Sequence, residues 1–271
     1  MKAPRDLLLQ LLNVTKREQA INGKTQPQVA GCVLSLKDNR VSTTSIVKDG
    51  KTSLSRFSFV WEQDGEELIP VPDIDRLLGV LKYHADVVTL SHSKESGKVL
   101  VKSKNKQTTL VGGLDSKAFA NSQQTLLEWH NTSVERAKQI DPAKRSYRMQ
   151  TGAIRNPFYS IQIPATEVFD AVRCDGINGQ KLNRYTFTVK NELLSVSVGD
   201  HFKGLTESEL GKATNVEDFT ATFEGGLENI LKHYTDIMTL SFLDFTEEGQ
   251  GIRLMLSFAN GDWVFQAGII T

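Results

Sequence analysis

The chain has 271 residues, of which 39% are hydrophobic and 24% are charged, with 32 basic and 32 acidic residues and zero formal net charge. This composition is that of an ordinary globular protein, and the length suits one large domain or two smaller ones. Zero net charge argues against a protein whose whole surface grips nucleic acid, although it permits a segregated basic face. Cys32 and Cys174 are the only cysteines, which favours a reducing compartment over a disulfide.

The first half of the sequence predicts a helix followed by strands, and then a second helix followed by further strands. An amphipathic helix at 5–14 has a short apolar run with no small-residue cleavage site after it, so we interpret it as mature protein rather than a signal peptide. Alternating residues predict a strand, a polar turn and a strand over 32–46. A helix follows at 73–84, and then come the alternating runs "VVTLSHS" and "KVLVKSK". No apolar stretch approaches the length of a membrane span, so we expect no membrane helix and a cytoplasmic protein.

Residues 114–156 break this pattern. A helix is possible at 122–139, whereas the Pro, Gly and polar residues of 141–157 predict an extended linker. Between 134 and 155 the basic residues outnumber Glu135 and Asp141; they are Arg136, Lys138, Lys144, Arg145, Arg148 and Arg155. The stretch is either a solvated linker or a basic insertion that contacts phosphate.

The second half repeats the first. A short helix is expected at 165–174, a strand–turn–strand at 185–198, a helix at 227–235 and then three closing strands. "LKYHADVVTLS" at 81–91 returns as "LKHYTDIMTLS" at 231–241, with six of eleven positions identical. The sequence therefore predicts an α+β protein made of two tandem copies of one domain, in which two short helices back antiparallel sheets. The predicted domains are 1–113 and 157–271, with 114–156 as the connector.

This organisation resembles the DNA sliding clamps of the two-domain type, namely proliferating cell nuclear antigen and the clamps of tailed phages. The segments that carry the resemblance are 71–104 and 223–270, in which a helix precedes closing strands. The resemblance implies a homotrimeric ring that encircles double-stranded DNA without reading its sequence and tethers DNA polymerase, with a clamp loader as a further partner. The long connector and the absence of an acidic tail after "GIIT" favour a phage or viral version, located in the host cytoplasm or nucleoid.

The resemblance also places residues at three surfaces. Polar residues on the outer faces of the predicted helices would face DNA phosphates: Arg5, Lys16, Arg17, Arg76, Lys82, Tyr83, Arg173, Lys232 and His233. Edge strands within 106–112 and 201–207 would join neighbouring subunits, through Thr108, Leu110, Phe202 and Leu205. A pocket beside the connector would accept a partner peptide, lined by Ile46, Val47, Ile252, Phe265, Ala267 and Ile269, although each of these six is also a candidate for plain core packing.

The sequence offers no catalytic or metal-binding motif. The five histidines and two cysteines lack metal-ligand spacing, and no phosphate-cradling glycine loop or Gly-x-Ser-x-Gly is present. We therefore expect no enzyme, no metal and no cofactor. The alternatives are a viral structural or assembly protein built of duplicated domains and, less well supported, a single-strand DNA-binding protein. The latter needs aromatic residues interleaved with basic ones, whereas Phe57, Phe59 and Phe187 occupy strand patterns.

Overall fold

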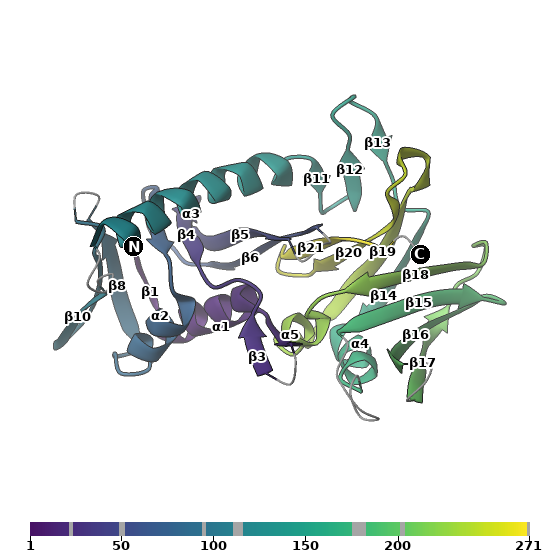
Figure 1. The fold of residues 1–271 in the computed structure, drawn as a ribbon, viewed down its shortest axis with the longest axis horizontal. Coiled ribbons are helices and arrows are strands. Elements are labelled where there is room, and N and C mark those ends of the chain that lie inside the picture. The colour runs from purple at the N-terminus through teal and green to yellow at the C-terminus, as the bar shows by residue number, and fades with distance from the viewer. Residues whose placement is uncertain are drawn as a thin grey trace. The chain divides into compact units, whose positions relative to one another are not determined.

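The computed structural model describes residues 1–21, 24–48, 52–93, 96–110, 116–174, 183–200 and 204–269 (Figure 1). The chain divides into two compact units. The N-terminal unit comprises Met1–Lys16, Val29–Ile46 and Arg56–Ala137, and the C-terminal unit comprises Arg17–Gln28, Val47–Ser55 and Lys138–Thr271. Among the described residues, no helix is long and apolar enough to cross a membrane.

Two antiparallel sheets and a pair of helices form the N-terminal unit. One sheet has the strand order β1-β8-β9-β10 and the other β7-β4-β5-β6, while helices α1 and α2 pack on each other. The elements are β1 (Lys2–Pro4), α1 (Arg5–Lys16), β4 (Cys32–Lys37), β5 (Arg40–Lys48), β6 (Thr52–Val60), β7 (Glu67–Val71), α2 (Ile74–Leu81), β8 (Val87–His92), β9 (Val99–Ser103) and β10 (Lys106–Leu110). The far ends of β5 and β6 belong to the C-terminal unit.

The C-terminal unit repeats this plan with the strand orders β14-β19-β20-β21 and β18-β15-β16-β17 and the helix pair α4 and α5. Its elements are β14 (Tyr159–Pro164), α4 (Ala165–Val172), β15 (Arg184–Lys190), β16 (Leu193–Asp200), β17 (Gly204–Lys212), β18 (Phe219–Glu224), α5 (Leu227–Leu231), β19 (Ile237–Phe245), the 3₁₀ turn η1 (Thr246–Glu248), β20 (Gly251–Phe258) and β21 (Trp263–Ala267). Element for element, both sheet orders match those of the N-terminal unit, which confirms the predicted duplication. The hairpin of β2 (Glu18–Ile21) and β3 (Lys24–Pro27) is an addition without a counterpart among the described elements.

The same tight turn opens the strand pairs of both units. Asp38 and Asn39 connect β4 to β5 with positive φ angles of 52° and 54°, and Asn191 and Glu192 connect β15 to β16 with 51° and 61°. Two consecutive positive φ angles are the signature of a two-residue type I′ turn, whose twist matches that of the strands it joins. The turns predicted within 32–46 and 185–198 are therefore hairpin turns that fix the register of each strand pair.

The repeated segment at 81–91 and 231–241 fastens the helices of each unit together. The carbonyl of Asp86 accepts a hydrogen bond from the backbone N–H of Arg5 at 2.8 Å, and the carbonyl of Asp236 accepts one from that of Ala165 at 3.1 Å. Each bond satisfies an N–H at the start of the first helix, which would otherwise lack a partner within that helix. The end of the second helix thus holds the beginning of the first.

The Tyr83–His84 pair, which recurs as His233–Tyr234, places an anchoring side chain at the same point of each repeat. His84 is 3% exposed, and its ring nitrogens lie 3.0 Å from the hydroxyl oxygens of Ser103 and Thr108. The preceding residue, Tyr83, is 75% exposed. In both units the second residue of the pair anchors the helix end to the closing strands.

Tyr234 occupies this position in the C-terminal unit and is partly exposed. Its ring stacks on Phe258 with centroids 3.8 Å apart, and its hydroxyl donates to the Oδ2 of Asp262 at 2.7 Å. Asp262 itself is 3% exposed, so this carboxylate depends on protein donors, of which Asn260 supplies another. Burial, followed by the charge of Asp262, raises the pKa of Tyr234.

Residues 116–155 are more ordered than the sequence analysis expected. The helix α3 runs over Ser116–Ala137 and packs on β4 and β7 within the N-terminal unit. The predicted extended linker instead contains a small sheet of β11 (Ile140–Asp141), β12 (Ser146–Arg148) and β13 (Ile154–Arg155) in the C-terminal unit. Tyr147 of this sheet stacks on Phe265 of β21 with centroids 5.1 Å apart. The expectation of a plain linker was wrong because this aromatic contact ties the segment to the unit.

Replacing Tyr234 with Phe tests the helix-end anchor. The substitution keeps the ring stacking but leaves the buried Asp262 carboxylate without one donor, so we expect the free energy of unfolding to fall by about 1–2 kcal/mol. Chemical denaturation measures this difference. Tyr83→Phe is the matched control, since Tyr83 is largely exposed, and equal stability of the two variants would contradict the anchoring role.

Candidate nucleic-acid interface and partner surfaces

The helix pair of the N-terminal unit exposes three of the residues predicted to face DNA. Arg76, Lys82 and Tyr83 are exposed on or just after α2. Asp73 caps this helix by accepting a hydrogen bond from the backbone N–H of Arg76 at 2.9 Å, which places the acidic group at the helix start, where the dipole favours it.

Two other predicted cations of this unit are engaged by carboxylates. Arg5 donates from Nε to Asp6 at 2.9 Å and from Nη1 to the carbonyl of His84 at 2.9 Å, and the hydrogen bond to Asp6 raises the pKa of Arg5. Lys16 forms an ion pair with Asp75 at 2.7 Å. A cation that must leave an ion pair to reach a phosphate gains less from the contact, so Arg5 and Lys16 are weaker candidates than Lys82.

The C-terminal unit presents the equivalent positions. Lys232 is exposed at the end of α5, and its Nζ donates to the Oδ1 of Asn229 at 3.0 Å. Arg173 at the end of α4 pairs with Asp170 at 3.2 Å and lies over the ring of Phe169. Lys82 and Lys232 occupy the same place in the two repeats, directly after the second helix.

His233 is placed less favourably for phosphate. Burial, helped by the neighbouring charge of Lys232, lowers the pKa of His233 from 6.5 to about 4. The imidazole is therefore neutral near pH 7 and adds no positive charge to this face.

Arg17 was wrongly predicted to face DNA. The side chain is 3% exposed, and the guanidinium donates to the hydroxyl of Ser53 at 2.9 Å and to that of Ser55. The chain leaves α1 at this residue with a φ of 43°, so the helical pattern that placed Arg17 on the outer face ends one residue earlier. Arg17 is thus part of the interior of the C-terminal unit.

The two segments predicted as edge strands lie at sheet edges. β10 is the last strand of β1-β8-β9-β10, and β17 is the last strand of β18-β15-β16-β17. Leu205 on β17 is 42% exposed, Thr108 on β10 is partly exposed and Leu110 is 6% exposed. Phe202, the fourth predicted interface residue, lies outside the described residues.

Comparison with solved structures gives one consistent fold. The whole chain matches the β chain of DNA polymerase III from Streptococcus pneumoniae with a TM-score of 0.64 and 14% identity, covering 64% of that chain. It also matches the β subunit from Thermotoga maritima with a TM-score of 0.62 and 14% identity, covering 64% of that chain. The match to the β subunit from Streptococcus pyogenes has a TM-score of 0.63 and 12% identity and covers 66% of that chain. No protein-family model and no curated protein matches the sequence.

The chain has the sliding-clamp fold. At this low identity the likeness establishes fold alone, and the chain spans just under two thirds of the length of those bacterial subunits. The predicted α+β class and the predicted resemblance to DNA sliding clamps are both confirmed.

Within this clamp fold, the residues predicted to form a partner pocket differ in exposure. Phe265 is 3% exposed and Val47 is 5% exposed, so these two are core residues. Tyr147 of β12 covers the ring of Phe265, a contact that the sequence analysis missed because it treated this segment as linker. Ile46, Ile252, Ala267 and Ile269 are partly exposed and stay candidates.

The basic connector also contributes fewer available cations than its sequence suggests. Arg155 forms ion pairs with Glu247, at 3.0 Å, and with Glu248, and these hydrogen bonds raise the pKa of Arg155. Lys144 lies 3.9 Å from Asp141. Part of the connector charge therefore serves to hold β13 to the η1 turn rather than to contact phosphate.

Two further features concern chemistry. No group of three or more His, Cys, Asp or Glu side chains with metal-binding geometry occurs among the described residues. A groove of about 910 Å³ lies in the N-terminal unit between α3 and the strands beneath it. No local sequence pattern indicates this groove, because the packing of α3 on β4 and β7 is a tertiary contact.

The depressed pKa of His233 predicts a pH-dependent contribution to stability. The unfolded chain takes up a proton near pH 6.5, whereas the folded chain does so only near pH 4. The stability that comes from the neutral buried ring is therefore complete above about pH 6.5 and is lost progressively as the pH falls to about 4. The free energy of unfolding should depend less on pH in this window for His233→Asn than for the wild type, and identical slopes would show that the ring titrates normally.

Proposed function

We propose that this protein is a DNA sliding clamp, a ring that encircles duplex DNA and tethers a DNA polymerase and other replication proteins without performing chemistry. The observation that carries the proposal is the match of the entire chain, with both of its repeated units, to β chains of DNA polymerase III. A protein that stays on DNA by enclosing it needs neither a sequence-reading surface nor a strongly positive one. This requirement agrees with zero net charge and with helices that carry both signs of charge.

Ring closure is proposed to pair the edge of β10 with the edge of β17 of the next subunit. Unpaired strand edges associate readily, and a head-to-tail contact of this kind closes into a cyclic oligomer when its rotation permits. Each chain contributes two similar units, so three copies would give a ring of six units. Exposed Leu205 on β17 supports an apolar contact at this edge.

DNA contact is proposed to come from the helix ends. Lys82 and Lys232 would meet phosphates from equivalent positions, and Arg76 would add a further contact. Such contacts position the ring on the duplex without reading bases. Because they are few, the association should depend mainly on topology and only modestly on salt. A clamp loader that opens the ring is the expected partner for circular DNA.

Native mass spectrometry tests the assembly. We expect a species with three times the 30.1 kDa mass of one chain. Leu205→Asp should shift the distribution to smaller species, because it places a charge at the proposed contact. Ile154→Asp is the matched control, since Ile154 is 55% exposed but lies on β13, which belongs to neither of the two edge-bearing sheets. A monomer at every concentration, or equal sensitivity to the two substitutions, would contradict the proposed ring.

Charge reversal tests the DNA-facing residues. The double variant Lys82→Glu with Lys232→Glu should keep the native mass but shorten the residence time on DNA by about ten-fold or more, because like charges then face the phosphates. Single-molecule residence measurements on duplex DNA give this ratio. Lys98→Glu with Lys190→Glu changes the same charge at two exposed residues outside the predicted surfaces and should leave the residence time unaltered, whereas equal effects of both pairs would remove Lys82 and Lys232 from the interface.

A further inference from the structure

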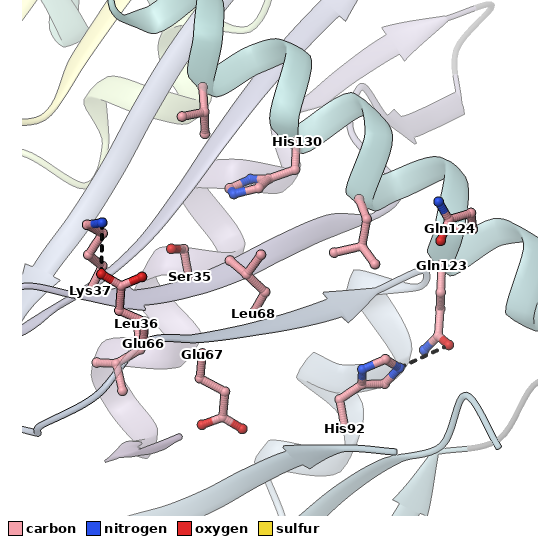
Figure 2. Close-up of a pocket in the computed structure, with 12 residues that line it drawn as sticks. Ser35, Leu36, Lys37, Glu66, Glu67, Leu68, His92, Gln123, Gln124 and His130 are labelled. Carbon is pink, nitrogen blue, oxygen red and sulfur yellow. Dashed lines mark hydrogen bonds and ion pairs between the residues drawn. The ribbon is translucent and has the colours of Figure 1, made fainter. Parts of the chain in front are cut away.

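The groove in the N-terminal unit is formed by four elements, α3, β4, β7 and β8. The helix α3 forms one wall, β4 and β7 form the floor, and His92 at the end of β8 closes one end (Figure 2). The volume of about 910 Å³ lies at the upper end of the range of ligand sites in proteins. Every residue that lines the groove belongs to the N-terminal unit.

The wall of this groove contains two buried polar groups that lack partners. Gln123 is 3% exposed and His130 is 7% exposed, and both side chains project from α3 toward the groove in Figure 2. The Oε1 of Gln123 lies 3.3 Å from the Nε2 of His92. Among the residues that the structure describes, however, the Nε2 of Gln123 and the Nδ1 of His130 have no hydrogen-bond partner. Buried polar atoms are almost always paired in folded proteins, so two such atoms in one groove indicate a site for a ligand that supplies the missing bonds.

The remaining lining defines the chemistry of that ligand. Leu68 on β7 is 43% exposed, and Leu127 and Val134 on α3 add further apolar surface. Lys37 and Glu66 form an ion pair with each other at 2.8 Å, and Glu67 is paired with the N-terminal ammonium of Met1, so the lining has no excess of positive charge. Burial lowers the pKa of His130, which keeps that ring neutral. These features disfavour phosphates and acidic ligands.

The floor of the groove favours a polypeptide as the ligand. β7 is the last strand in the order β5-β4-β7, and an edge strand can pair with an added strand through main-chain hydrogen bonds. An extended peptide also has both kinds of group, because one of its carbonyls can accept from Gln123 while the N–H of another of its amides can donate to the Nδ1 of His130 when that nitrogen carries no proton.

We propose that this groove binds a short extended peptide segment of a partner protein, neutral or basic in charge, with an aliphatic side chain that packs on Leu68 and Leu127. The groove shares no lining residue with the partner pocket predicted from the sequence, which comprises Ile46, Val47, Ile252, Phe265, Ala267 and Ile269. Peptide binding in this groove does not require ring formation, so it can be tested independently of the proposed function.

Selection from a displayed library of random short peptides, with the full-length protein as the bait, tests the proposal. Synthetic fluorescent copies of the selected peptides are then titrated against the wild type and variants by fluorescence anisotropy. We expect the selected sequences to share an aliphatic residue and to avoid acidic ones. We also expect Leu68→Glu to raise the Kd by about ten-fold or more, because it removes apolar contact and adds negative charge.

Two further variants keep the result interpretable. Gln123→Leu removes the unpartnered amide at nearly constant volume, so it should weaken peptide binding without lowering the free energy of unfolding. Trp129→Ala alters the exposed side of the same helix and should leave the Kd unchanged. Unaltered binding to Leu68→Glu and Gln123→Leu, recovery of acidic peptides only, or failure to select any binding peptide would each overturn the proposal. The Leu68→Glu variant should have the same native mass as the wild type. Its native mass therefore distinguishes a loss of peptide binding from a loss of ring assembly.

Discussion

The turn that follows the second helix of each unit is the contact on which the structure depends. Its aspartate carbonyl holds the start of the first helix, and the residue two positions earlier anchors the helix end against the closing strands. A short helix has little stability of its own, so α2 and α5 depend on this turn and on packing against α1 and α4. Of the six identities, the two leucines of each copy are fully buried, which agrees with this shared geometry.

Duplication of such a unit connects the fold to the proposed function. Two copies in one chain provide two equivalent helix pairs and two sheet edges, β10 and β17, that differ in sequence. Two different edges allow a head-to-tail contact, which a single self-complementary edge would not favour. The proposed enclosure of DNA is compatible with a chain of 32 basic and 32 acidic residues, since topology would replace much of the electrostatic attraction.

Periodicity predicted the parts of the structure that are repeated or strongly amphipathic. The alternation around Asp38 and Asn191 and the copies at 81–91 and 231–241 were sufficient for the fold class, whereas the edge positions of β10 and β17 were implied by the resemblance to sliding clamps. The small sheet β11-β12-β13 was missed because strands of two or three residues have no readable period. Arg17 was misplaced because its left-handed backbone lies one residue beyond α1. The groove beneath α3 depends on long-range packing, of which a single sequence carries no local signal.

The central claim is that the protein encloses DNA, and trapping on a linear duplex tests it most directly. The protein is incubated with biotinylated linear DNA, the ends are then blocked with streptavidin, and the complex is washed at high salt, which removes electrostatic binders. If the protein encloses DNA, it should be retained on blocked DNA, lost rapidly from unblocked DNA, and released from blocked DNA after a single internal cut. Equal retention on DNA with blocked and with free ends, or complete loss from blocked DNA, would contradict enclosure.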